Sequence, residues 1–92
     1  MRTPTIHLNG TSARELREQL AKAYLAVTEA QDKLAQAMPH GRDYYVQKGD
    51  ATNEAQAEMR ARIAKLEEVK TELMLMHQAV ADQERSRRNP HE

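Results

Sequence analysis

The feature that most constrains this chain is an unbroken heptad pattern of apolar residues over residues 16–37. Apolar side chains recur at alternating spacings of four and three residues, which places them in one stripe along an α-helix. The stripe consists of Leu16, Leu20, Ala23, Val27, Ala30, Leu34 and Ala37. Ser12 and Glu15 fit a capping box at its start, and Pro39 disfavours helical backbone at the residue before it. We therefore predict a first helix over residues 12–38.

A second stripe with similar spacing runs through residues 55–80. Its members are Ala55, Met59, Leu66, Val69, Leu73, Met76 and Val80. Arg62 stands where an apolar residue is expected, and Ile63 beside it is predicted to take over the contact. Because Asp50 is a favourable N-cap residue, we predict a second helix over residues 51–84.

Two helices joined by the loop 39–50 predict an all-α fold, an antiparallel two-helix hairpin with coiled-coil-like packing. Gly41 is expected to take a left-handed conformation in this loop. The hairpin would occupy residues 12–84 as one domain.

The two ends of the chain have patterns of their own. In residues 1–11, Ile6 and Leu8 alternate with His7, which predicts a short N-terminal extended arm. Ile6 and Leu8 would either cover one end of the helix pair or reach a neighbouring subunit. Residues 85–92 read as a flexible basic tail, whose arginines are Arg85, Arg87 and Arg88.

Composition limits the classes of protein that fit. The chain has 92 residues, 39% of them hydrophobic, and it contains no Cys, Phe or Trp, so disulfides and thiolate chemistry are excluded. No apolar run approaches the roughly 18 residues that a membrane-spanning helix needs. The first residues lack the apolar core of a signal peptide, so we expect a cytoplasmic protein. A formal net charge of zero argues against general nucleic-acid binding.

A two-helix hairpin has one mutual seam and no closed core, so a chain of this size usually needs partners to be stable. The turn from Leu73 to Met76 is apolar on all sides, and Leu25 lies off its seam. The predicted oligomer interface consists of Leu25, Leu73, Met74, Leu75 and Met76. We predict a homo-oligomeric helical bundle, for which a dimer with four helices is the simplest form. The alternatives are a higher assembly or a hairpin that folds only against a different protein.

The sequence contains no recognisable catalytic or metal-binding pattern. The 4 histidines are scattered, with no second histidine at a ligand spacing, and no nucleophile motif or Gly-rich phosphate loop is present. We therefore predict no enzymatic activity, no metal and no cofactor. His77, next to the second stripe, is expected to be a packed or interface histidine.

The loop PHGRDYYVQKGD, residues 39–50, is the predicted functional site. Connections between two helices commonly take about two to eight residues, and this one combines basic and aromatic side chains. An arginine can bind phosphate in a bidentate manner, and tyrosine rings can stack on a base. The predicted ligand-binding residues are His40, Arg42, Asp43, Tyr44, Tyr45 and Lys48. If the segment is extended, at most one of the two adjacent tyrosines faces inward.

Two other interpretations of the loop stay open. A tyrosine could cover the end of the hairpin while Arg42 pairs with Asp43, which would give the loop an ordering role only. The loop could also be a protein epitope.

The stretches TIHLNGTS and PHGRDYY, between two helices of this length, resemble small accessory proteins encoded by bacteriophages and prophages. The resemblance covers residues 4–83. It implies a counter-defence role, either sequestering cyclic nucleotide signals as an oligomer or binding a host defence protein. We accordingly predict a non-enzymatic oligomer that captures a small anionic, nucleotide-like ligand. The alternative is a protein–protein interaction module that inhibits a host defence complex or assists phage assembly.

Overall fold

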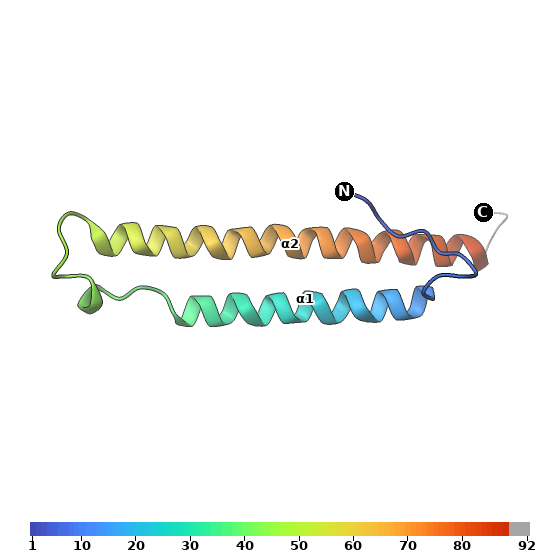
Figure 1. Ribbon diagram of the computed structural model, residues 1–92, viewed down its shortest axis with the longest axis horizontal. Helices are drawn as coiled ribbons and strands as arrows, with labels where there is room; N and C mark the ends of the chain where they lie inside the picture. The colour runs from blue at the N-terminus through green and yellow to red at the C-terminus, as the bar shows by residue number, and fades with distance from the viewer. Residues whose placement is uncertain (89–92) are drawn as a thin grey trace.

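The computed structural model describes residues 1–88, which form an antiparallel pair of long α-helices (Figure 1). Helix α1 spans Ala13–Gln36 and helix α2 spans Ala51–Arg88. A short 3-10 helix, η1, spans Gly41–Asp43 in the connecting loop. The described residues contain no strand, and the molecule is a rod of 66 × 20 × 18 Å. The predicted all-α, two-helix architecture is confirmed.

Helix α1 begins where the capping pattern predicts and ends slightly early. The Ser12 Oγ accepts a hydrogen bond of 3.1 Å from the amide of Glu15, which satisfies one of the free amides of the first turn. The last helical residue is Gln36, two residues before the predicted end at Met38. The steric effect of Pro39 on the preceding backbone accounts for an end in this region.

Helix α2 begins at Ala51, as predicted, directly after Asp50. The Asp50 carbonyl accepts from the amide of Glu54 at 3.0 Å, and its carboxylate accepts from the Asn53 side-chain amide at 2.9 and 3.1 Å. The left-handed residue of the loop is Gly49, with φ 75°, so the prediction for Gly41 was wrong. Gly41 instead opens η1, where helical backbone is required.

Helix α2 continues to Arg88, past the predicted end at residue 84. Arg85 and Arg87 are therefore helical and not part of a flexible tail. An ion pair of 2.7 Å between Arg85 and Asp82, three residues apart, supports this last stretch. Residues 89–92 of the predicted tail lie outside the described residues.

The seam between α1 and α2 is thin. Val80 is the one fully buried side chain among the described residues. Most of the other predicted seam residues are half-buried, but Ala30 and Ala37 are exposed. Ile63 is half-buried beside an exposed Arg62, as predicted. The predicted seam residue Val69 is 41% exposed, and its neighbour Lys70 faces α1 in its place.

A polar cluster occupies the middle of this seam. The Lys70 side chain is only 12% exposed, and its Nζ donates to the Gln31 Oε1 at 3.1 Å. The same Nζ lies 3.6 Å from the Glu67 carboxylate and 4.9 Å from the centre of the Tyr24 ring. The Gln31 amide donates to Glu67 at 2.8 Å and to the carbonyl of Ile63 at 3.2 Å. Because a polar group inside a helical seam is satisfied in one register only, this cluster selects the alignment of α1 on α2.

The residues before Ser12 run back along the end of α2 (Figure 1). Gln83 binds these residues through the oxygen and the nitrogen of its side-chain amide. Its Oε1 accepts from the Ile6 amide at 2.8 Å, and its Nε2 donates to the Pro4 carbonyl at 2.7 Å. Leu8 is 94% exposed, so the expectation that it covers the helix end together with Ile6 was wrong. The Gly10 amide donates to the His7 carbonyl at 3.1 Å and closes a turn. The backbone is therefore not extended after His7, whereas the predicted alternation of Ile6, His7 and Leu8 assumed an extended arm.

At the same end of the rod, Arg17 of α1 and Glu84 of α2 form an ion pair of 3.1 Å. Both side chains are about one-third exposed or less, so water screens this pair less than the ion pairs within the helices whose two side chains are both about half exposed or more. Within the described part of the chain, no helix is both long and apolar enough to cross a membrane.

We expect Lys70→Ala to lower the free energy of unfolding by about 1–2 kcal/mol, because it removes a cation–π contact and a hydrogen bond from the seam. Urea denaturation followed by circular dichroism, at one protein concentration, measures the loss. Lys65→Ala is the matched control, since Lys65 is an exposed lysine of the same helix. Equal stability of the two variants would contradict the role of the cluster.

The same cluster predicts a pH effect. The pKa of Glu67 lies below its ordinary value because Gln31 donates a hydrogen bond to the carboxylate and the positive charge of Lys70 lies beside it. A carboxyl group with a lowered folded-state pKa contributes stability that is present above its unfolded pKa, 4.5, and is lost as the pH falls through the folded value. We therefore expect Glu67→Gln to lose less stability than the unaltered chain when the pH falls below 4.5. Superimposable acid profiles of the two proteins would rule out this coupling.

Candidate functional site

The loop predicted as the functional site forms the closed tip of the rod (Figure 1). His40 caps η1, because its Nδ1 accepts from the amide of Arg42 at 3.2 Å. The amide of Gln47 donates to the Tyr44 carbonyl at 2.9 Å and closes a further turn. The loop is tied to α2 by Gln56, whose side-chain amide donates to the carbonyl of Pro39 at 3.0 Å. These bonds give the tip a defined shape.

The two adjacent tyrosines of the tip have different surroundings. Tyr45 is 79% exposed, whereas Tyr44 is half-buried. Tyr44 lines a groove of about 320 Å³ between the loop and the first turns of α2. The groove residues are Ala37, Pro39, Tyr44, Gln47, Ala51, Glu54, Ala55, Glu58, Met59 and Arg62. One tyrosine therefore packs against the helices while the other is open to a partner.

The charges in the Tyr44 groove do not favour an anion. Its lining includes two carboxylates, Glu54 and Glu58, and one cation, Arg62. Arg62 already lies 3.7 Å from the Glu58 carboxylate. A phosphate bound beside Tyr44 would face more negative than positive charge, which is unfavourable at short range.

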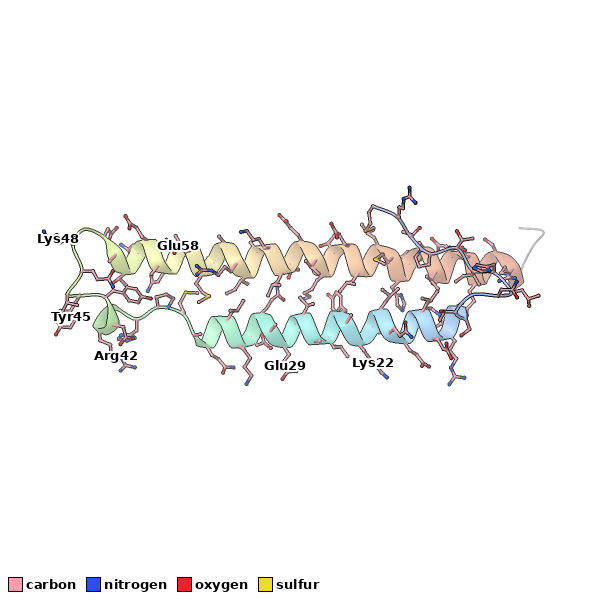
Figure 2. The ribbon with its side chains drawn as sticks, in the orientation of Figure 1. Lys22, Glu29, Arg42, Tyr45, Lys48 and Glu58 are labelled. Atoms are coloured by element: carbon pink, nitrogen blue, oxygen red, sulfur yellow. The ribbon has the colours of Figure 1, made fainter. Side chains whose placement is uncertain are left out.

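The other predicted ligand-binding residues are exposed and lie outside the Tyr44 groove. They are His40, Arg42, Asp43, Tyr45 and Lys48. In Figure 2 the side chains of Arg42, Tyr45 and Lys48 project from the tip in different directions. Within one chain, the structure therefore does not gather the predicted cations and both tyrosines around a single concave site.

A second groove lies on the side of the rod, and its lining is apolar. It has a volume of about 300 Å³ and is formed by both helices. Its residues are Leu20, Ala21, Tyr24 and Leu25 of α1, and Leu73, Met74 and His77 of α2. We call this surface the lateral groove.

The lateral groove brings together part of the predicted oligomer interface. Leu25, Leu73 and Met74 all line it, with Leu25 and Met74 exposed by 66% and 54%. Leu75 is 52% exposed but does not line the groove, and Met76 is half-buried elsewhere along the seam. The prediction thus named residues on more than one side of α2.

Sequence reasoning had not assigned Leu20, Ala21 and Tyr24 to a shared surface with Leu25. The available signal was a pair of adjacent apolar residues in each helix, Tyr24–Leu25 and Leu73–Met74. In such a pair one residue packs in the seam and the next lies about 100° round the helix, at the edge. Two edges on the same side of a hairpin form the walls of a groove.

No cluster of three or more His, Asp or Glu side chains able to hold a metal ion is present among residues 1–88. Comparison with known proteins adds no assignment: no protein-family model, curated protein or solved structure matches this chain.

Proposed function

We propose that this chain is a non-enzymatic protein–protein interaction module that binds an apolar protein surface through the lateral groove. The observation that carries the proposal is the apolar lining shared by the two helices, with Leu25 and Met74 exposed at its edges. A contiguous apolar surface that forms a groove is typical of a binding site, whereas isolated exposed leucines are not.

The thin seam supports the same proposal. A folded domain usually buries more than the one side chain that is fully buried among the described residues, since burial of apolar area is the main favourable term in folding. A partner over the lateral groove would remove further apolar surface from water, and the stability of the hairpin would then depend on that partner.

We expect Met74→Glu to weaken partner binding by at least about tenfold, because it places a carboxylate in an apolar interface without a charge to pair it. Leu75→Glu is the matched control: Leu75 is the next residue, is exposed to a similar degree and lies outside the groove. A tagged form of the chain would be used to capture proteins from a cell lysate that also contains an untagged form of the chain. Each captured protein would then be identified and purified.

The decisive measurement is direct binding of the purified partner to the three forms of the chain. Binding to the unaltered chain and to Leu75→Glu, but not to Met74→Glu, supports the proposal. Equal binding to Met74→Glu would show that the groove is not the contact surface.

A second candidate function is capture of a small anionic ligand at the tip, as in the counter-defence role that the resemblance to phage accessory proteins implies. The observation in its favour is the exposure of Tyr45, 79%, close in the chain to the exposed cations Arg42 and Lys48. Because these side chains diverge within one chain (Figure 2), a compact site would need tips from more than one subunit.

Native mass spectrometry with a panel of cyclic nucleotides tests this second candidate. We expect bound nucleotide mass with the unaltered chain and its loss in Arg42→Ala, since arginine would supply the phosphate contact. Arg60→Ala, at an exposed arginine of α2 away from the tip, is the control and should retain the ligand. Absence of bound mass with every nucleotide in the panel, or retention in Arg42→Ala, would contradict capture at the tip.

A further inference from the structure

We infer that the partner of the lateral groove is a second copy of this chain, packed groove against groove to form a four-helix bundle. This inference rests on the proposed function and names its partner. Three observations carry it: the surface area of the hairpin, the shape of the groove and the charges around it.

The hairpin exposes more surface than a monomeric protein of its mass. Its accessible surface is 7164 Å², whereas a monomer of 10.5 kDa typically exposes about 5,400 Å². Its radius of gyration is 19.8 Å, compared with about 12 Å for a compact chain of this length. The excess area, about 1,700 Å², is within the range that each subunit of a permanent homodimer buries. A second copy that buries this area would leave each chain with about 5,400 Å² exposed, the ordinary value for its mass.

The groove has the profile that two-fold packing requires. Leu25 and Met74 are its exposed walls, while Leu20, Tyr24 and Leu73 are half-buried between the helices and form its floor. A two-fold axis places the same patch of both copies face to face. The walls of the two copies then meet and enclose the apolar floors of both grooves, as the facing apolar stripes do in a helical bundle.

The charges favour a copy of the chain over a strongly charged partner. The groove lining contains no Asp, Glu, Lys or Arg, so an acidic or basic segment would find no opposite charge there. The chain has a formal net charge of zero, so two copies do not repel each other as a whole. An apolar surface of matching size is the complement of this groove, and every molecule of the protein carries one.

Two relative directions satisfy the symmetry. If the rods are antiparallel, α1 faces α1, and Leu25 of one copy lies near the same residue of the other. If the rods are parallel, α1 of one copy faces α2 of the other, and Leu25 lies near Met74. Either arrangement covers the same groove.

The first test is the mass of the unaltered chain in solution, by light scattering after size exclusion over a wide range of protein concentration. We expect twice the chain mass of 10.5 kDa, and the same for Leu75→Glu. Met74→Glu should run at the single-chain mass, with circular dichroism reporting whether it stays helical. A monomeric unaltered chain would overturn this inference while leaving a different protein as partner of the groove. A dimer that persists in Met74→Glu would overturn it as well.

A second test does not depend on a destabilising charge. Because the chain has no cysteine, single cysteines introduced at the groove can be cross-linked with a short bis-maleimide. Antiparallel packing predicts dimer cross-links in Leu25→Cys and in Met74→Cys separately. Parallel packing predicts them only when the two variants are mixed. Leu75→Cys, outside the groove, should cross-link poorly in both cases, and efficient cross-linking of Leu75→Cys alone would contradict the assigned face.

Discussion

The structure depends on one constraint: each helix has a single apolar stripe, and two stripes make a seam but not a core. The packing of the two helices along the whole rod depends on that thin contact. Most side chains at the seam are half-buried and some are exposed, and only Val80 among the described residues is fully buried. Apolar burial alone then distinguishes poorly between neighbouring registers of the two helices. If one helix slides by a heptad, each leucine or alanine of the seam is replaced at its contact by a similar residue. The polar cluster around Lys70 supplies the missing specificity, because the hydrogen bonds that Gln31 makes with Lys70 and Glu67 form at one alignment.

Much of the fold could be predicted from the sequence because its signals are local. The heptad spacing, the capping box at Ser12 and the N-cap position of Asp50 each depend on residues within one or two turns of one another. Helix starts were accordingly right. The end of α2 was not, since an Arg-, Gln- and Glu-rich stretch has good helix propensity without an apolar pattern, and a pattern-based reading stops where the apolar residues stop.

The predictions that failed concern which side chain of one helix packs against the other helix. Val69 is apolar and fits the heptad, yet Lys70 faces α1, because a lysine has a long aliphatic stem that packs while its ammonium group reaches polar partners. A binary pattern counts lysine as polar and cannot detect this. A sequence pattern is equally unable to detect the candidate binding surfaces. Leu25 and Met74 are separated by half the chain, and only the pairing of the helices places them beside one groove. The tip residues, by contrast, are neighbours in sequence, yet Arg42 and Lys48 diverge in space (Figure 2).

The hairpin arrangement also has a consequence for the order of folding. Contacts between the two halves are separated by steadily more of the chain from the tip to the open end: 17 residues for Gln56 with Pro39, 39 for Lys70 with Gln31, and 67 for Arg17 with Glu84. Once a contact nearer the tip has formed, the next one closes only a short additional loop, so its entropic cost is small. The helices can therefore zip together from the tip outward. The bonds of Gln83 to Pro4 and Ile6, which span 79 and 77 residues, would form last and open first.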